Sequence, residues 1–394
     1  MNEVASIIRD AIRAEGVISF ARFMEMALYC PVHGYYERGE QTLGRGGDYY
    51  TSVSVGSLFG ELLGFQFAEW LAPPLSGGQA PAPGTAGRPP EAARIAEGGA
   101  HGGQLAADIL NWLRQWRPEL FARLEYWLIE PSARRREWQQ RRLAEFGPAV
   151  RWVNELAALV PRCSGPSGSI QPGFRGVIFA NELLDALPVR RLGWDAKQRA
   201  WFEWGVALKA DGFAWARMDR GAEEIQGLLS GRAGDPARVS ARPDWSWLPD
   251  GYTLEVCPAA TAWWGQAASL LADGKLLTLD YGLSAEELLA PERPRGTLRA
   301  YHRQCQHQDV LARPGEQDLT AHVNFSALQA AGESAGLRTA ALVSQEEFLT
   351  SIAARVWEGE AGFAEWTARW TRQFRTLTHP EHLGQRFRVL IQGR

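Results

Sequence analysis

Three polar side chains able to do chemistry follow directly after a short apolar run. Val177–Ala180 has the length and β-branched content of a buried strand, and Asn181, Glu182 and Asp185 come next. Polar groups just past the carboxyl end of a buried parallel strand lie where open α/β sheets bind ligands. Two carboxylates and an amide there can hold a cationic or hydroxyl-rich molecule. Pro188 ends the segment because it cannot donate to a following strand ladder.

A second candidate is the glycine-rich turn Glu97–Gly103, which follows one predicted strand and opens a helix. Its glycines, among them Gly99 and Gly103, would let the backbone pass close to a bound nucleoside. A tight turn without a ligand explains the same residues. The dinucleotide fingerprint fits poorly because His101 stands at its third position. Glu97 would repel a pyrophosphate and suits a positively charged ligand better.

Polar side chains also end the next two predicted strands. Glu130 follows Tyr126–Ile129, where an acidic residue can accept both ribose hydroxyls of a nucleoside. A surface carboxylate at a helix N-terminus is the alternative interpretation of Glu130. Asn154 follows the third strand, Val150–Val153, where an adenine would lie.

Two polar clusters lie toward the C-terminus. Tyr301–His307 contains two histidines and Cys305, but it supplies no fourth ligand or CxxC pair for tetrahedral zinc, so we expect no metal. The stretch Glu316–Phe325 carries Asp318 and His322 before a helix. It is either an N-capping loop or a loop that contacts substrate.

Composition limits the classes of protein to consider. The chain has 394 residues and a formal net charge of -3, so it lacks the basic stripe that nucleic-acid binding would need. Its four cysteines are far apart, which favours a reduced compartment. The stretch Met1–Gly16 is amphipathic and acidic, unlike a secretory signal or transit peptide. No run reaches the roughly 18 apolar residues of a membrane span, and we expect a cytoplasmic protein.

The elements that would position these residues alternate between strand and helix, which predicts a parallel sheet with right-handed crossovers. The predicted strands are Arg94–Ala96, Tyr126–Ile129, Val150–Val153, Val177–Ala180, Lys275–Leu279 and, at the end, Phe387–Gln392. A Trp-rich β-hairpin around Asp195–Lys197 interrupts this alternation, and residues 219–250 read as irregular. Residues 73–90, rich in proline and glycine, predict a linker or exposed loop.

Nine stretches of the chain resemble the MidA family of S-adenosylmethionine-dependent methyltransferases. The family's mitochondrial members are complex I assembly factors that methylate a protein arginine. Two stretches are specific, Asn181–Pro188 and Glu316–Val323. The others are Phe20–Tyr36, Gly47–Ser52, Leu58–Leu63, Asp108–Leu110, Glu130–Ser132, Asp280–Gly282 and Gly296–Tyr301.

The resemblance implies an α/β fold of the class I methyltransferase type, with a Rossmann-like seven-stranded sheet whose last strand is antiparallel. It also implies an N-terminal helical cap and an inserted β-hairpin region. We therefore expect a cap over residues 1–72, a Pro/Gly-rich loop over 73–93 and a methyltransferase domain over 94–394. Within that domain we expect a β insertion over about 189–256 and a substrate loop over about 296–325.

The resemblance, together with the residue types and their positions, gives expected roles for the candidate residues. S-adenosyl-L-methionine would be bound by Glu97, Gly99, His101, Gly103, Glu130, Asn154, Asp48, Thr51 and Ser52. A guanidinium has a pKa above about 12, so carboxylates must localise its charge and expose a lone pair. Glu182 and Asp185 are the candidates for that clamp, and Asn181 would orient the acceptor or the methionine end. Asp318, His322 and Tyr301 are candidate substrate contacts.

The chain departs from the family pattern at two points near the cofactor. His101 replaces the middle glycine of the loop, and Val53 and Ser54 replace a Pro-Glu pair. A non-catalytic assembly or scaffold protein with the same fold is therefore the competing hypothesis. A nicotinamide oxidoreductase is disfavoured by the absent fingerprint. We expect a protein substrate and neither nucleic acid nor membrane as a partner, and a homodimer stays open.

Overall fold

The computed structural model describes residues 2–39, 51–72, 92–160, 173–210, 212–230, 244–303, 305–357, 363 and 366–394. Asp48 and most of the Pro/Gly-rich stretch lie outside these residues. The chain forms two compact units. The sheet unit comprises Thr51–Asn181, Gln266–Leu279 and Gly332–Arg394. The insert unit comprises Met1–Tyr50, Glu182–Gly265 and Asp280–Ala331.

A mixed sheet of eight strands has the order β15-β16-β10-β5-β2-β3-β4, with β14 beside the end of β10. From β10 to β4 the neighbouring strands pair in parallel, whereas β15 and β16 pair antiparallel. The strands are β2 (Ala93–Gly98), β3 (Leu124–Ile129), β4 (Val150–Val153), β5 (Phe174–Asn181), β10 (Leu271–Leu283), β14 (Val323–Asn324), β15 (Arg338–Ser344) and β16 (Phe387–Gly393).

The six predicted strands are confirmed, since each lies within a strand of this sheet. Short apolar runs identify them because strands buried on both faces need continuous apolar sequence. Val177–Ala180 in β5, for example, is almost completely buried. The sequence did not indicate β15, whose residues alternate between exposed and half-buried positions and carry few large apolar side chains.

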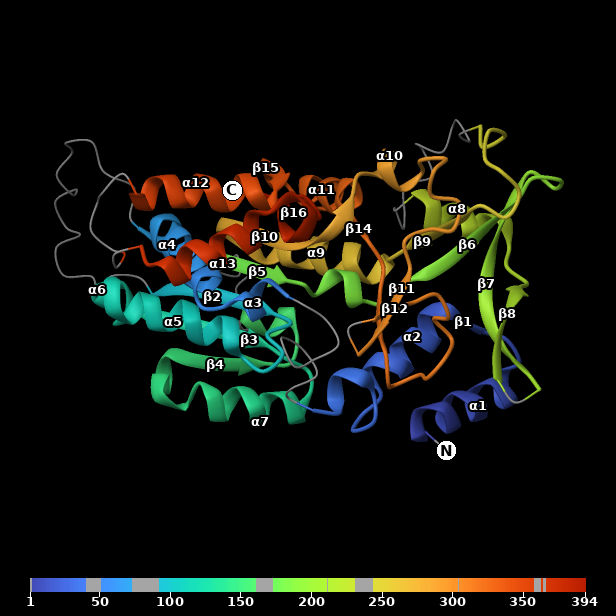
Figure 1. The fold of residues 1–394 in the computed structure, drawn as a ribbon, viewed down its shortest axis with the longest axis horizontal. Helices are drawn as coiled ribbons and strands as arrows, with labels where there is room; N and C mark the ends of the chain where they lie inside the picture. The colour runs from blue at the N-terminus through green and yellow to red at the C-terminus, as the bar shows by residue number, and fades with distance from the viewer. Residues whose placement is uncertain are drawn as a thin grey trace, which may run out of the picture. The chain divides into compact units, whose positions relative to one another are not determined.

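Helix α4 (Leu58–Leu71) lies at the centre of the helices of the sheet unit. It packs against α5 (Gln104–Trp116), α12 (Gln345–Trp357), α13 (Ala368–Thr378) and strand β5 (Figure 1). Because neighbours surround it, most of its positions are apolar and buried. A Cβ atom on Gly60 would lie 2.5 Å from a side chain of α5, so a glycine is needed at this approach.

The remaining helices complete the two units. Those of the sheet unit are α3 (Ser52–Val55), α6 (Pro118–Phe121) and α7 (Ala133–Arg142). Those of the insert unit are α1 (Glu3–Glu15), α2 (Phe20–Tyr29), α8 (Ala222–Ser230) and α10 (Ala285–Leu288). Helices α9 (Pro258–Leu270) and α11 (Phe325–Ser334) contribute residues to both units. No helix in the described part of the chain is long and apolar enough to cross a membrane.

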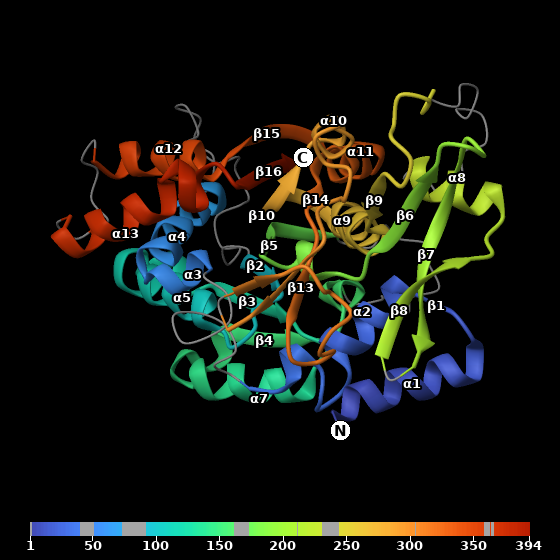
Figure 2. The same ribbon diagram turned by 45° about the vertical axis from the view of Figure 1, so that its right-hand side comes forward.

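The insert unit is built on two antiparallel sheets. The larger has the order β1-β7-β6-β9, with β8 beside β7 (Figure 2). Its strands are β1 (Ile18–Ser19), β6 (Arg190–Asp195), β7 (Ala200–Lys209), β8 (Gly212–Met218) and β9 (Thr253–Val256). The smaller consists of β11 (Arg299–His302), β12 (Cys305–His307) and β13 (Asp318–Thr320). The hairpin expected around Asp195–Lys197 is therefore confirmed as β6 and β7.

Residues expected to be irregular include a helix, and that expectation was wrong for α8, which packs against β7 (Figures 1 and 2). Glu223 and Glu224 stabilise its first turn through the helix dipole, and Ile225 is buried. Helices α1 and α2 also contact β7, and an apolar core that includes Ile8 and Phe23 fills the space between these elements.

Candidate functional site

The candidate residues of the sheet unit lie at one edge of its sheet. In the parallel register Gly98 of β2 is paired with Ile129 of β3, and Ile129 with Val153 of β4. Gly98 is also paired with Ala180 of β5. The residues that follow these positions therefore share the carboxyl edge, where α/β sheets bind ligands. They are Gly99, Glu130, Asn154 and Asn181, as the sequence predicted.

The turn from β2 into α5 has an unusual backbone. Gly99 and Gly103 have φ angles of 78° and 79°, in the left-handed region that glycine adopts without a steric penalty. His101 is also left-handed, at φ 44°, and a residue with a Cβ pays roughly 1–2 kcal/mol for that conformation. Its ring centroid lies 5.9 Å from that of Trp138 in α7. The turn therefore keeps the left-handed backbone that glycine favours, although His101 occupies one of its positions.

Glu97 is the acidic residue near the end of β2, and its side chain is buried. The hydroxyl of Tyr126 in β3 donates a hydrogen bond of 2.6 Å to its carboxylate. Burial raises the pKa of Glu97 to about 7, and the hydrogen bond from Tyr126 opposes that rise. Glu97 is thus poised to change its charge near neutral pH.

Glu130, in contrast, is held by a set of donors. Its Oε1 accepts hydrogen bonds of 2.9 Å from the backbone N–H of Ser132 and from Nε of Arg135. Arg135 also places its second nitrogen 2.8 Å from the carboxylate, and both side chains are buried. These donors lie on Oε1, so the acceptor capacity that Glu130 keeps for a hydroxyl donor is at Oε2.

Gln139 of α7 was not predicted and links several parts of this edge. Its amide nitrogen donates to the carbonyl of His101 at 2.9 Å and to Oε2 of Glu130 at 3.2 Å. Its carbonyl oxygen accepts from the indole of Trp152 at 3.0 Å. No local motif marks such a residue, because its partners come from three other segments of the chain.

The other predicted cofactor residues of the sheet unit differ in their surroundings. Thr51 caps α3 in a capping box with Ser54. Ser52 is buried, and its hydroxyl donates to Gln345 of α12 at 3.1 Å. Asn154 is exposed at the end of β4.

The insert unit brings together carboxyl groups that are distant in sequence. Asp280 accepts backbone N–H bonds from Leu184 at 2.8 Å, Asp185 at 3.4 Å and Tyr281 at 2.8 Å. The side chains of Asp185 and Asp280 are also hydrogen-bonded to each other. Two carboxyl groups can share a hydrogen bond only when one of them carries a proton. Glu182 precedes this turn, half-buried and with a left-handed φ of 51°.

The electrostatics of this pair follow from burial. Burial raises the pKa of Asp185 well above its ordinary value, and the carboxylates of Asp280, Asp318 and Glu182 raise it further. Burial likewise raises the pKa of Asp280, although its backbone hydrogen bonds oppose the rise. Low-dielectric surroundings and like charges both disfavour ionisation. A cation brought to this pair would favour the ionised form.

Asp318 of β13 lies close enough to Asp185 for its charge to raise the pKa of Asp185. It is buried and accepts a hydrogen bond of 2.8 Å from the hydroxyl of Tyr36. Tyr36 stacks on Tyr29, whose hydroxyl donates to the carbonyl of Ala186 at 3.0 Å. Tyr301 of β11 is the backbone partner of Asp318. The predicted substrate residues Asp318 and Tyr301 are therefore neighbours.

His322 belongs to a different network of the insert unit. Its backbone N–H donates to the hydroxyl of Thr297 at 3.1 Å, and the N–H of Thr297 donates to Glu255 at 2.6 Å. Burial lowers the pKa of His322 to about 4, and the charges of Arg299 and Arg293 lower it further. Its imidazole is therefore neutral at neutral pH.

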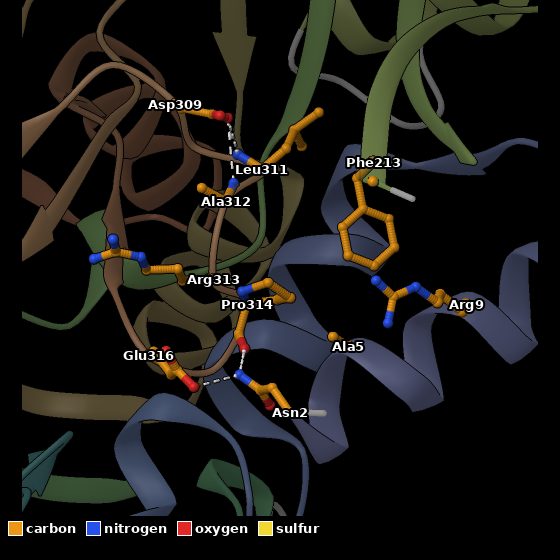
Figure 3. A pocket seen from close by; sticks show the side chains of 11 residues that line it. Asn2, Ala5, Arg9, Phe213, Asp309, Leu311, Ala312, Arg313, Pro314 and Glu316 are labelled. Carbon is orange, nitrogen blue, oxygen red and sulfur yellow. Dashed lines mark hydrogen bonds between the residues drawn. The ribbon is translucent and has the colours of Figure 1, made fainter. Parts of the chain in front are cut away.

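A surface pocket of about 380 Å³ lies in the insert unit, beside the N-terminus of α1 (Figure 3). Asn2 donates to the carbonyl of Pro314 at 2.7 Å and to Glu316 at 3.0 Å. The guanidinium of Arg9 lies over the ring of Phe213, 5.5 Å from its centroid. None of the predicted site residues lines this pocket. Its hydrogen bonds hold the loop before β13 onto α1.

Cysteine, histidine and carboxylate side chains come together nowhere in the described ranges in a group of three or more that could hold a metal ion. His302 and His307 approach each other across β11 and β12, with ring centroids 6.3 Å apart. The Nδ1 atom of His302 lies 2.7 Å from the carbonyl oxygen of Glu316.

Comparisons with known proteins show the family and the fold of this chain. A protein-family model described as "Putative S-adenosyl-L-methionine-dependent methyltransferase" matches residues 82–343. A crystal structure of a Burkholderia thailandensis protein bound to S-adenosyl-homocysteine is similar over 99% of this chain and 92% of that chain. The two are 30% identical, with a TM-score of 0.76. The fold is therefore a methyltransferase-like α/β fold with a mixed sheet of eight strands.

Curated relatives are similar along nearly the whole chain. The mouse protein arginine methyltransferase NDUFAF7, mitochondrial, is 28% identical over 98% of this chain and 84% of its own length. The human protein of the same name is 26% identical over 98% of this chain and 83% of its own length. Both are named as mitochondrial proteins, and this contradicts the cytoplasmic location expected from the sequence.

Proposed function

This chain belongs to the S-adenosyl-L-methionine-dependent methyltransferases, and we propose that it methylates an arginine side chain of a protein. S-adenosyl-L-methionine is the methyl donor. The observation that carries the choice of acceptor is the buried pair of Asp185 and Asp280, for which burial and mutual repulsion favour a cationic ligand. Relatives named protein arginine methyltransferases support the same choice.

For the cofactor, we assign the carboxyl edge of the sheet unit. Glu97, Gly99, His101 and Gly103 would border the methionine part, and Glu130 would accept the ribose hydroxyls. The left-handed turn and the donor-held carboxylate of Glu130 fit such a ligand. Asn154 would lie at the adenine, and Asp48, Thr51 and Ser52 would complete the site.

For the acceptor, we assign Glu182 and Asp185 to the two ends of the guanidinium. Bidentate carboxylates localise its positive charge on the nitrogens that they bind, which leaves the third nitrogen able to attack. Asn181 would orient the acceptor or the methionine end. Asp318, Tyr301 and His322 would contact the substrate around it.

The bound cofactor supplies a methyl group on a positively charged sulfur. The attacking nitrogen forms one bond to that methyl group while the bond to sulfur breaks, and one proton leaves the guanidinium. A carboxylate whose pKa is raised, such as Asp185, is suited to take that proton. Alignment of the reacting groups alone can contribute roughly 7–11 kcal/mol.

The finer architecture is part of the same proposal. We assign the seven strands from β15 to β4 to a Rossmann-like core of the class I type. Residues 1–72 would form the helical cap, with α1 and α2 in the insert unit and α3 and α4 packed within the sheet unit. Residues 73–93 would be the connecting loop, and 94–394 the methyltransferase domain with its β insertion and substrate loop. A protein is the proposed partner, rather than nucleic acid or membrane, and the Trp-rich insertion would suit a partner surface; a homodimer stays open.

A methyltransferase fold without activity is the second candidate function. The observation in its favour is His101, which keeps a left-handed φ of 44° where the resembling family has a glycine. Such a protein would act in assembly or as a scaffold.

Calorimetry combined with a methylation assay separates the two candidates. We expect micromolar binding of S-adenosyl-L-methionine and transfer of its methyl group to arginine-containing protein. Glu182→Gln should keep the affinity for the cofactor and lower methylation by about a hundredfold or more, because the guanidinium loses a charged partner. Glu286→Gln, on the exposed face of α10, is the matched control and should behave like the wild type. Cofactor binding without any transfer would favour the scaffold.

A further inference from the structure

The side chain of Gln139 is buried in the sheet unit and connects three other segments of the chain. It belongs to α7 and is 0% exposed. Its amide nitrogen donates to the carbonyl of His101 at 2.9 Å and to Oε2 of Glu130 at 3.2 Å, and its amide oxygen accepts from the indole of Trp152 at 3.0 Å. The turn after β2, the end of β3 and strand β4 therefore meet at one amide group.

The orientation of this amide follows from what each partner can do. An indole N–H can only donate, so the amide oxygen of Gln139 must face Trp152. The two N–H groups must then face the carbonyl of His101 and the carboxylate of Glu130, which accept. The amide cannot turn over without losing all three hydrogen bonds. The three partners therefore fix the direction of its N–H groups.

The two oxygens of Glu130 are held by different parts of the chain. Oε1 accepts from the backbone N–H of Ser132 and from the guanidinium of Arg135, both of which closely follow Glu130 in sequence. Oε2 accepts from Gln139, which comes from further along α7. Because a carboxylate oxygen can accept two hydrogen bonds, Oε2 can take a hydroxyl in addition to Gln139.

Gln139 also lies against the turn after β2. A Cβ atom on Gly103 would lie 3.5 Å from Cγ of Gln139, so the stem of this side chain packs beside the end of the turn. His101, within the turn, has a left-handed φ that a side chain disfavours, and its carbonyl accepts from Gln139. Gln139 therefore links the position of Oε2 of Glu130 to the position of this turn.

We propose that Gln139 is a positioning residue for the cofactor, whose amide directs Oε2 of Glu130 toward the ribose hydroxyls. This inference rests on the proposed cofactor site. The hydrogen bonds on Oε1 hold one end of the carboxylate, but a carboxylate held at one oxygen can still rotate about the bond that joins it to the side chain. The hydrogen bond from Gln139 to the second oxygen restricts that rotation before the ligand arrives, so less ordering is needed on binding.

Removing the amide should weaken one specific part of cofactor binding. In the wild type, a ligand without ribose hydroxyls loses a hydrogen bond to a charged group, and we expect it to bind about 10–100-fold more weakly. Gln139→Met keeps the length of the side chain but removes its amide. In this variant S-adenosyl-homocysteine should bind about tenfold more weakly, and removal of the hydroxyls should cost about three- to tenfold less than in the wild type. A purely structural role would weaken both ligands equally.

The test is calorimetric binding of S-adenosyl-homocysteine, and of its analogue that lacks both ribose hydroxyls, to the full chain. Both ligands keep the amino-acid part, the sulfur and the adenine, so the ratio of their dissociation constants reports on the hydroxyls. The matched control variant is Gln140→Met, which makes the same substitution at the next, exposed position of α7. If Gln139→Met does not fold, Trp152→Phe serves instead, because it removes the indole donor that fixes the orientation of the amide.

We expect the ratio of dissociation constants to be the same in the wild type and in Gln140→Met, and lower in Gln139→Met or in Trp152→Phe. An unchanged ratio in the variant used would overturn this inference and leave the proposed function standing. Equal binding of both ligands by the wild type would overturn the inference together with the assignment of Glu130 to the ribose, but not the methyl transfer. Absence of binding of S-adenosyl-homocysteine would overturn both the inference and the proposed function.

Discussion

The two regions that carry acidic side chains differ in how their charge is balanced. In the sheet unit, Glu130 is surrounded by donors, and Arg135 lies 2.8 Å from its carboxylate. In the insert unit, Asp185 and Asp280 are equally buried, but they are hydrogen-bonded to each other. A carboxylate whose charge is neutralised by an arginine, such as Glu130, is suited to accept hydrogen bonds from neutral hydroxyl groups. The pair of Asp185 and Asp280 has carboxyl neighbours instead, and is suited to bind a cation. On this difference we base the proposal that the region of Glu130 binds the nucleoside and the region of Asp185 binds the guanidinium.

The largest effect on stability is expected when Arg135, the ionic partner of Glu130, is removed. Arg135→Ala leaves a buried carboxylate without its ionic partner, and breaking a buried pair in this way costs about 3–5 kcal/mol. We expect that loss in the free energy of unfolding, measured by denaturant titration, with weaker binding of S-adenosyl-homocysteine. Arg141→Ala, on the exposed side of the same helix, should change the stability by less than about 0.5 kcal/mol. Similar losses of unfolding free energy in both variants would contradict the claim that Arg135 neutralises the charge of Glu130.

The second prediction concerns the unbalanced pair and activity. Asp185→Asn keeps the size of the side chain but removes the proton acceptor proposed for methylation. We expect the methylation rate to fall by about 10²–10⁴-fold, because a positioned base contributes that much. Cofactor affinity, measured by calorimetry, should stay within a few-fold of the wild type. Full activity in this variant would remove Asp185 from the reaction.

The pair also makes stability depend on pH. The folded state raises the pKa of Asp280 from an ordinary value near 4 to about 7, so the folded protein holds this proton more tightly than the unfolded chain. This contribution is fully present below about pH 4 and is lost as the pH rises through 7. We expect the unfolding free energy to fall over that range, and to fall less steeply in Asp280→Asn. Asp273→Asn, exposed in the same strand, should keep the wild-type slope.

The smallest effect is expected at His322. Its pKa is lowered to about 4, so its imidazole stays neutral between pH 5 and 8. Replacing it by glutamine should change methylation by less than about tenfold and leave the shape of the pH profile in that range unchanged. A profile that loses a limb near neutral pH in His322→Gln would show that this imidazole titrates during the reaction.

Much of the sheet could be predicted from the sequence because buried parallel strands are short apolar runs. Val177–Ala180 is recognisable without any neighbour, and so is the polar residue that follows it. The small strands β11 to β13 were not predicted, since most of their positions are exposed or polar. Helix α8 was not predicted because glycine and arginine residues around it favoured an irregular segment.

Residues that hydrogen-bond to the predicted site residues were harder to predict than the site residues themselves. Tyr126 and Gln139 have no local signature, because each acts through side chains from other segments. Asp280 lies 95 residues from Asp185, and only the parallel pairing of β5 with β10 brings the ends of these strands together. Sequence periodicity gives the face of an element, but partners across a sheet depend on strand order.

The most direct test of the central claim is to locate the transferred methyl group. The protein is incubated with isotopically labelled S-adenosyl-L-methionine and a peptide library that contains arginine in one half and lysine in the other. Tandem mass spectrometry then identifies the labelled residue. We predict label on arginine side chains, absent with Glu182→Gln and retained with Glu286→Gln. Label on lysine alone, or no label while the cofactor is bound, would contradict the proposed function.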